Sequence, residues 1–168
     1  IYCDYNNASK GTARVATISG TSVSFGTAAI YENQFSDNER LNLTYTNSNK
    51  SVIIWGRQSD DHEGRAVVAT ISGTSLSFGT AVRFATSTAW PLGMDVAFDS
   101  ATGTVVIAFG DNDGGNAYQQ AVVGTISGTD LTLGSEIDIY QGEAYTTSLA
   151  LAASGKVFIG YHPLITSK

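Results

Sequence analysis

The pentapeptide Thr-Ile-Ser-Gly-Thr occurs three times in this chain of 168 residues, beginning at Thr17, Thr70 and Thr125. The spacings are 53 and 55 residues (70 − 17 and 125 − 70). The flanks repeat as well: ARVATISGTSVSFGTA begins at residue 13, AVVATISGTSLSFGTA at 66 and AVVGTISGTDLTLGSE at 121. A period of this length indicates one supersecondary unit used several times in tandem. The repeat therefore restricts the chain to an array of similar units.

Each period contains four segments with the pattern of a β-strand. The first alternates in polarity, as a strand with one buried face does, and the second is nearly all apolar, which favours burial on both faces. The third enters the pentapeptide, whose Ser-Gly pair makes a tight turn, and the fourth follows it. The segments are 41–45, 94–98 and 148–151 for the first strand, 52–55, 105–109 and 157–159 for the second, and 23–25, 76–78 and 131–133 for the fourth.

A unit of four antiparallel strands in about 50 residues, repeated in tandem, is typical of a β-propeller blade. One small twisted sheet cannot cover both of its faces, whereas stacked blades cover one another. We therefore predict an all-β fold over residues 1–168, a propeller-like array of three four-stranded antiparallel blades. The periods are approximately 1–39, 40–92, 93–146 and 147–168, and the first and last are parts of blades. An open β-solenoid or sandwich array of the same hairpins is the alternative.

The number of periods bears on the assembly. A propeller closes with about four to eight blades, so three periods predict either a fragment of a longer propeller or a homo-oligomer. The chain also begins inside a strand pattern, because Ile1 aligns with Ile54 of the next period. We therefore expect further blades, from the same polypeptide or from other copies of it.

Composition narrows the set of partners. Charged residues are 14% of the chain, Lys and Arg number nine, and the formal net charge is −6. An acidic surface disfavours nucleic acid and anionic membranes as partners. No apolar run approaches the roughly 18 residues that a membrane helix needs. Cys3 is the only cysteine, so a disulfide framework within one chain is excluded.

The pattern Ala-x-Val-(Ala/Gly)-Thr-Ile-Ser-Gly-Thr-x-(Val/Leu)-(Ser/Thr)-(Phe/Leu)-Gly resembles a tandem repeat of bacteriophage tail-fibre and related virion surface proteins. The order of the strands also resembles that of kelch-type blades. The resemblance covers the whole chain and includes no catalytic motif. It implies a β-propeller adhesin module at the virion surface, outside the host cell. Its implied partners are a host surface glycan or receptor, and other virion proteins or further blades.

One loop has the composition of a cation site. Residues 111–116, Asp-Asn-Asp-Gly-Gly-Asn, place Asp111 and Asp113 in the acidic alternation of a calcium loop. The corresponding loops of the other periods do not share this spacing, and a polar, glycine-rich turn is the alternative. We therefore predict no cofactor, with calcium at Asp111 and Asp113 as the metal to test.

No catalytic constellation is recognisable. His62 and His162 stand in neither a nucleophile triad nor a metal-ligand spacing, and the five arginines (14, 40, 57, 65 and 83) are too scattered to predict a carboxylate-binding triad. Acidic pairs such as Asp37 with Glu39 or Asp60 with Asp61 could serve general acid–base chemistry, but they are more often solubilising charges. We predict that the chain is not an enzyme and assign no catalytic residue.

Two sets of aromatic residues repeat. Phe35, Trp90 and Tyr145 fall between the fourth strand of one period and the first strand of the next. We predict them as ligand-binding candidates that stack on sugar faces, with plugs between blades as the alternative. The second set repeats at stricter spacing, which predicts packing between blades. It consists of Tyr31, Phe84 and Tyr140, and of Tyr45 and Phe98.

The predicted function is attachment of a virion surface or fibre protein to a host surface glycan or protein, through loops at one rim. A purely structural decoration or spacer is one alternative. A fragment of a glycan-degrading propeller enzyme is another, and it would need a convergent cluster of ionisable groups.

Overall fold

The structure is a computed structural model that describes residues 1–57, 63–85, 92–113, 116–142, 144–153 and 155–163. Side chains are described at these positions except at residues 35–40, 92, 112–113, 116–117, 144–146 and 153. The described chain is built of antiparallel strands, with one 3-10 turn, η1 (Tyr5–Asn7). The predicted all-β class is confirmed.

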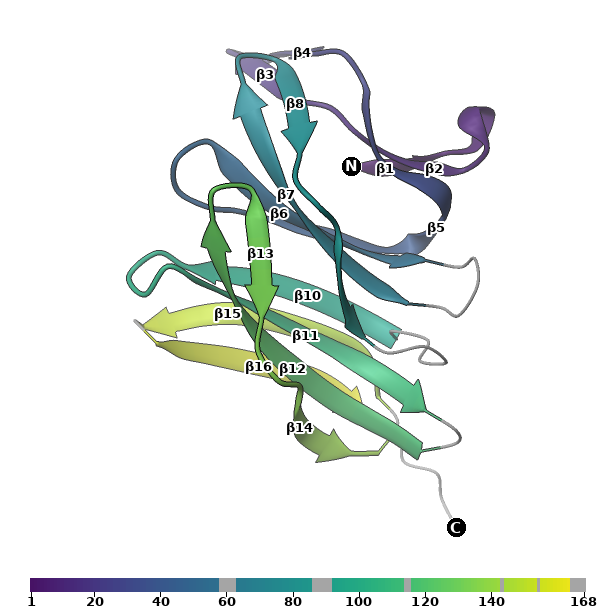
Figure 1. The fold of residues 1–168 in the computed structure, drawn as a ribbon, viewed down its shortest axis with the longest axis vertical. Coiled ribbons are helices and arrows are strands. Elements are labelled where there is room, and N and C mark those ends of the chain that lie inside the picture. The colour runs from purple at the N-terminus through teal and green to yellow at the C-terminus, as the bar shows by residue number, and fades with distance from the viewer. Residues whose placement is uncertain (58–62, 86–91, 114–115, 143, 154, 164–168) are drawn as a thin grey trace.

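Figure 1 shows the N-terminal strands at the top, the sheet of β5 to β8 below them, and the strands from β10 onward in the lower half of the molecule. They are β1 Tyr2–Asp4, β2 Lys10–Ala13, β3 Ala16–Ser19, β4 Ser22–Phe25, β5 Ala29–Tyr45, β6 Lys50–Arg57, β7 Gly64–Ser72, β8 Ser75–Phe78, β9 Val82–Ala85, β10 Leu92–Asp99, β11 Thr104–Asp113, β12 Asn116–Ser127, β13 Asp130–Leu133, β14 Ile137–Gln141, β15 Ala144–Ala153 and β16 Lys156–Pro163.

Two sheets contain all four predicted strands of a period. The middle sheet has the order β5-β6-β7-β8, and the following sheet has the order β10-β11-β12-β13. Each also has a short strand that the sequence pattern did not predict, β9 in the first and β14 in the second. The long third strand therefore pairs along one edge with two successive short strands: β8 meets residues 69–72 of β7, and β9 meets residues 64–66.

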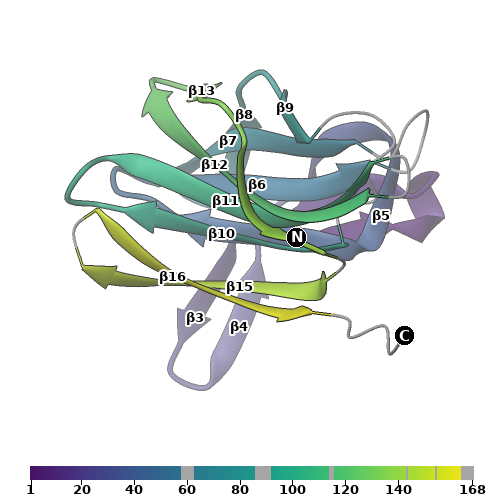
Figure 2. The ribbon, with the colours of Figure 1, turned by 90° about the horizontal axis from the view of Figure 1, so that it is seen from below.

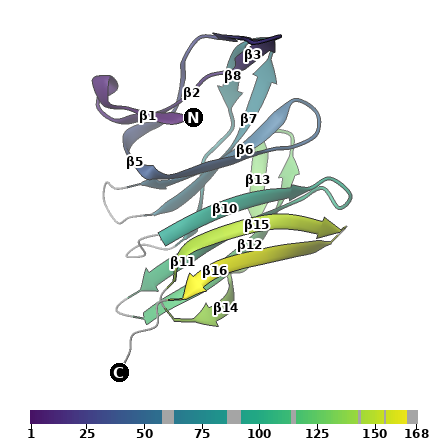
Figure 3. The ribbon, with the colours of Figure 1, turned by 180° about the vertical axis from the view of Figure 1, so that it is seen from behind.

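The two ends of the chain form smaller units. The N-terminal sheet contains β1, β2 and residues 29–35 of β5, which continues into the middle sheet. Strands β3 and β4 form a separate hairpin that projects from the stack (Figure 2). The C-terminal hairpin, β15 with β16, lies against the following sheet and in front of it in Figure 3.

Burial of β6 explains the stacking. Val52 and Ile54 point into a core cluster shared with the following sheet, and Ile53 and Trp55 point into a second cluster on the opposite face. All four side chains are at most 2% exposed. The prediction that this strand is covered on both faces is confirmed. The same prediction is wrong for β16, where Phe158 is 70% exposed. No sheet of the described chain lies against the face of β16 that carries Phe158.

An aromatic pair recurs at each junction. The ring centroids of Tyr31 and Trp55 are 5.0 Å apart, and those of Phe84 and Phe109 are 5.1 Å apart. Tyr140 and Tyr161 form the third pair, with centroids 5.3 Å apart. The prediction that Tyr31, Phe84 and Tyr140 serve packing is therefore confirmed.

The two residues of the second aromatic set, Tyr45 and Phe98, differ in burial. Phe98 is buried in the core cluster that contains Val52, whereas Tyr45 is 59% exposed. The packing prediction is therefore right for Phe98 and wrong for Tyr45. Phe98 packs in the core between the middle and following sheets, whereas Tyr45 belongs to neither core cluster of the described residues.

The pentapeptide turns contact the glycine that ends the preceding repeat's fourth strand. A Cβ atom on Gly26 would overlap the carbonyl oxygen of Thr74, and one on Gly79 would overlap that of Thr129. The turn itself needs a glycine at each copy, since Gly20, Gly73 and Gly128 have φ of 58–62°. The turn of one repeat and the glycine that follows the fourth strand of the preceding repeat thus form one packing contact between successive sheets.

A carboxylate joins three successive first strands. Asp95 of β10 accepts hydrogen bonds from the side-chain amide of Asn42 in β5, at 2.7 Å, and from the backbone N–H of Leu149 in β15, at 2.7 Å. Asn42 and Asp95 occupy the same repeat position, 53 residues apart. These bonds hold neighbouring sheets in register along one side of the stack.

The glycine contact leads to a prediction with a matched control. Gly79→Ala forces a methyl group against the Thr129 carbonyl, and we expect the free energy of unfolding to fall by about 1–3 kcal/mol, as overpacking does. Gly134→Ala, at the same repeat position, meets its nearest atom, the Val123 carbonyl oxygen, only at 3.3 Å. Urea denaturation should show the larger loss for Gly79→Ala, and equal midpoints for the two variants would contradict the contact.

The Asp95 bridge gives a second prediction. Asp95→Ala removes an ionised acceptor from two inter-sheet hydrogen bonds and leaves the Leu149 N–H without this partner. We expect a loss of about 2–3 kcal/mol in the free energy of unfolding. Asn42→Ala removes only one of the two bonds and should cost less. If thermal unfolding ranks the variants in the reverse order, the bridge is not a principal tie between the sheets.

Candidate ligand-binding site

Most of the predicted site residues fall where side chains are not described. Trp90 lies in residues 86–91, outside the described chain, and so does His62 in residues 58–62. The backbones of Phe35 and Tyr145 belong to β5 and β15, but their side chains lie outside the description. Their role as sugar-stacking residues therefore stays a prediction.

The calcium site also stays a prediction, because only one of its two candidate side chains is described. Asp111 and Asp113 both belong to the last residues of β11, which stay paired with β12 (Asp111 opposite Tyr118, Asp113 opposite Asn116). The Asp111 side chain is buried and 5% exposed, whereas that of Asp113 is not described. Within the described ranges, no group of three or more His, Cys, Asp and Glu side chains is arranged to hold a metal ion.

Three of the five arginines meet at one end of the middle sheet, contrary to the expectation that they are too scattered. Arg57 ends β6, Arg65 is the second residue of β7 and Arg83 lies in β9. All three surround Glu63, which directly precedes β7. This group of four side chains is called the arginine cluster below. The end of the sheets that carries it, where β6 ends and β7 begins, is called the loop end.

The distances define the cluster. The Glu63 Oε2 accepts from Arg65 Nε at 2.7 Å and lies 2.5 Å from Arg65 Nη2, so one carboxylate oxygen contacts two nitrogens of the same guanidinium. The Glu63 Oε1 accepts from Arg83 Nη1 at 3.1 Å. Arg57 Nη1 is 3.6 Å from Oε2, within ion-pair range. A single carboxylate thus faces three guanidinium groups.

Local backbone geometry brings these residues together. The N–H of Arg57 donates to the carbonyl of Glu63 at 2.8 Å, which sets the Glu63 backbone beside the end of β6. Gly64 lets the Phe84 ring approach, since a Cβ atom there would lie 2.5 Å from that ring. This approach seats β9 on β7 with Arg65 directly opposite Arg83. Sequence reasoning missed the pair because it depends on β9, whose only signal is the short alternation Val82-Arg83-Phe84.

The electrostatics keep Glu63 ionised. Burial raises the pKa of the Glu63 carboxyl, but the hydrogen bonds and positive charges of Arg65 and Arg83 outweigh burial and leave the pKa below its usual value. The side chain of Glu63 is 14% exposed, against 46% for Arg83. A second carboxyl stands near Arg83: burial raises the pKa of Glu136, the charge of Arg83 lowers it, and that of Asp138 raises it again.

The same cross-strand position differs in each repeat. The aligned pairs directly opposite each other are Thr12 with Ile30, Arg65 with Arg83, and Gln120 with Asp138. In the third pair the Gln120 amide donates to the Asp138 carboxylate at 2.9 Å. The stacking contacts repeat, whereas the side chains of this pair change from neutral to basic to acidic. Thr12 is buried and only 1% exposed, so only Ile30 of the first pair is open to solvent. The second and third pairs are accessible, and there the same frame carries different surface charges.

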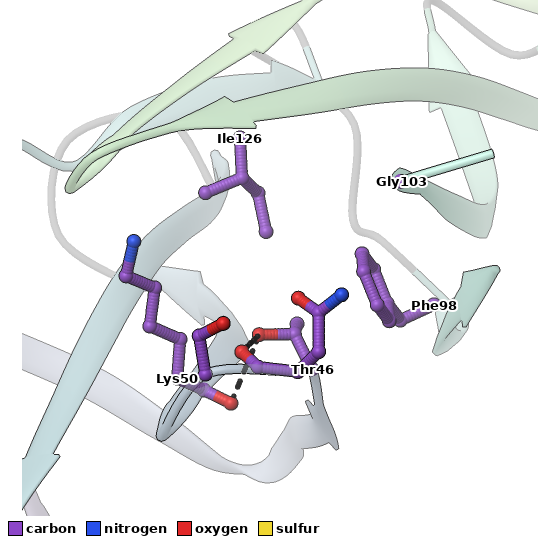
Figure 4. A pocket seen from close by; sticks show the side chains of 7 residues that line it. Thr46, Lys50, Phe98, Gly103 and Ile126 are labelled. Carbon is purple, nitrogen blue, oxygen red and sulfur yellow. Dashed lines mark hydrogen bonds between the residues drawn. The ribbon is translucent and has the colours of Figure 1, made fainter. Parts of the chain in front are cut away.

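A pocket also opens at the opposite end, between the β5–β6 turn and the following sheet (Figure 4). It measures about 140 Å³ and is lined by Thr46, Asn47, Ser48, Lys50, Phe98, Gly103 and Ile126. The Thr46 hydroxyl donates within its own turn, to the carbonyls of Asn47 and Lys50 at 3.1 and 3.0 Å. Lys50 Nζ donates to the Gly128 carbonyl at 2.6 Å. The Lys50 bond joins the β5–β6 turn to the β12–β13 turn beside the pocket.

Comparison with known proteins identified no relative: no protein-family model, curated protein or solved structure matches the chain. In the described residues, no helical segment has the length and apolarity needed to cross a membrane.

The Glu63 pKa gives a pH prediction. A carboxyl whose pKa is lower in the folded than in the unfolded state stabilises the fold above the unfolded pKa, about 4.5. That stability is lost as the pH falls through the folded pKa. We expect the difference in free energy of unfolding between the parent and Glu63→Gln to be largest above the unfolded pKa of about 4.5 and to shrink as the pH falls below it. Urea titrations at several pH values measure it, and a constant difference would contradict an ionised, paired Glu63.

Proposed function

We propose that this chain is a non-enzymatic attachment module of a virion surface or fibre protein, which binds a glycan or protein of the host surface reversibly. Its stacked sheets would act as blades of a β-propeller that further blades, or other copies of the chain, complete. The site would lie at the loop end, where the variable pair of each repeat is found. Several weak contacts on successive blades would act together, because linked sites raise the apparent affinity.

One observation carries this proposal: the loop-end pair changes its chemistry between repeats while the packing frame does not. Packing alone does not explain the two solvent-accessible pairs, since the same frame accepts Arg65 with Arg83 as well as Gln120 with Asp138. Ligand binding would explain these differences, because a ligand that spans several blades meets different side chains on successive blades. Loops and strand ends on a rigid scaffold are common positions for recognition.

A structural role is the second candidate, and a different observation favours it. Ile18, Val23 and Phe25 of the β3–β4 hairpin are 74%, 55% and 63% exposed. Their counterparts in the third repeat, Ile126, Leu131 and Leu133, pack in or against the core. An apolar groove of about 240 Å³ adjoins this region, lined by Ala13, Arg14, Val15, Ala16, Leu43, Ser51, Ile53, Ala69, Ile71 and Leu76. This face suits contact with other virion proteins or further blades.

The attachment proposal is tested on immobilised surfaces. The 168-residue protein is passed over neutral polysaccharides (dextran, mannan and galactan), acidic ones (polygalacturonate and dextran sulfate) and whole-cell envelope extracts of bacteria. We expect reversible binding to at least one surface. We also expect Lys156→Ala, at the opposite end of the sheets, to leave it unchanged. Failure to bind any of these surfaces would overturn the attachment proposal in favour of the structural role.

The same samples separate binding from hydrolysis. A glycosidase needs a carboxylic acid with a raised pKa and a second carboxylate, and Glu63 is instead held ionised by arginine. We expect no reducing sugar to be released from any bound polysaccharide. If sugar is released, Glu136, whose pKa burial raises, is the first residue to replace, and a loss of release in Glu136→Gln would establish the enzyme.

A further inference from the structure

We infer that the arginine cluster binds an anionic group, a carboxylate or a sulfate ester, of a surface polysaccharide. This inference rests on the proposed function and deepens it, because it assigns a ligand class to one blade. The site is made by Arg65 and Arg83, with Arg57 beside them and Glu63 beneath them.

The charge balance of the cluster is the first argument. The four side chains carry a formal charge of +2 (3 − 1), and with the nearby Glu136 the local charge is still +1 (3 − 2), in a chain whose net charge is −6. Each guanidinium has five N–H donors, whereas a carboxylate offers about four acceptor positions. Glu63 therefore cannot satisfy the donors of Arg65 and Arg83 together. Residues 58–62, which include Asp60 and Asp61, lie outside the described chain, and no part of the site is assigned to them.

The position of the pair is the second argument. Like charges directly opposite each other on neighbouring strands destabilise a sheet. The other two repeats place a neutral pair or a hydrogen-bonded pair at this position, so the frame does not need two arginines there. Glu63 offsets part of the repulsion between Arg65 and Arg83. A bound anion would offset more of it, which couples ligand binding to the stability of the β7–β9 edge.

The exposure of the side chains is the third argument. Glu63 and Arg57 are each 14% exposed, Arg65 is 24% exposed and Arg83 is 46% exposed. The glutamate therefore holds the guanidinium groups from the sheet side, while Arg83 faces solvent. A guanidinium is planar and forms paired hydrogen bonds to carboxylate and sulfate-like oxygens. The cluster is thus held in place by the fold and remains accessible to a ligand.

The test uses the intact protein and three polymers: polygalacturonate carries carboxylates, dextran sulfate carries sulfate esters, and dextran is neutral. We expect binding to one or both charged polymers, weakened by salt, and none to dextran. Arg83→Gln should weaken binding about tenfold, which is the effect of losing one charge-assisted contact. Arg14→Gln removes the same charge from an exposed site outside the cluster. It should change the affinity for the charged polymers by less than about twofold.

Glu63→Gln gives the sharpest readout, because it distinguishes a binding site from a structural ion-pair network. Removing the internal carboxylate raises the formal charge of the cluster from +2 to +3, so we expect tighter binding of the anionic polymers together with a lower melting temperature. If Glu63→Gln does not fold, the affinities of Arg83→Gln and Arg14→Gln for the anionic polymers decide whether the cluster binds anions.

The outcomes separate the two proposals. Equal effects of Arg83→Gln and Arg14→Gln, or weaker binding by a folded Glu63→Gln, would overturn the anion site. Binding to a neutral polysaccharide alone, unaffected by Arg83→Gln, would overturn the anion site and leave the attachment function intact. Competition by free galacturonate or by inorganic sulfate identifies which anionic group is bound.

Discussion

The structure depends on the burial of a strand that is apolar on both faces. Val52 and Ile54 of β6 point to one side of the middle sheet, and Ile53 and Trp55 point to the other. A four-residue run of this kind cannot be satisfied by its own sheet, because each face needs a separate partner. Successive repeats supply those partners, so the sheets stack in chain order. The aromatic pairs and the glycine contacts are consequences of that stacking.

Polar contacts determine how the stacked sheets are aligned. Burial of apolar surface is not directional and would tolerate some sliding between sheets. Asp95 removes that freedom on one side of the stack by accepting from Asn42 and from Leu149. Lys50 does so at the turn end by donating to the Gly128 carbonyl. Equivalent positions of successive repeats are thereby brought to the same end of the molecule.

This alignment separates two kinds of residue. Positions that contact a neighbouring sheet keep their character between repeats, as Tyr31, Phe84 and Tyr140 do. Positions at the loop end that face away from the stack are released from this requirement. The pairs opposite each other there carry different charges in each repeat, and the arginine cluster is the most highly charged example. A stack of identical frames can thus present a surface that varies along its length.

Periodicity in the sequence was sufficient for the regular part of the fold. The four strands of each period and the buried second strand of the middle sheet follow from alternation and apolar runs, which are local properties. The strands β9 and β14 were missed because no tight-turn signal precedes them, whereas the similarly short β8 and β13 each follow a Ser-Gly turn. The exposure of Tyr45 was also missed, because it depends on what lies in the preceding repeat rather than on the residue itself.

By itself, the sequence determined that the chain folds into repeated antiparallel strands, that β6 is covered on both faces and that the Ser-Gly pair of each repeat makes a turn. Only the tertiary structure decided which distant residues meet. Arg57, Arg65 and Arg83 are separated by up to 26 residues (83 − 57) and share no local pattern. They converge because β9 seats on β7 with Arg65 opposite Arg83, while Glu63 lies between them. Register is set by long-range pairing, and charge clusters follow from register.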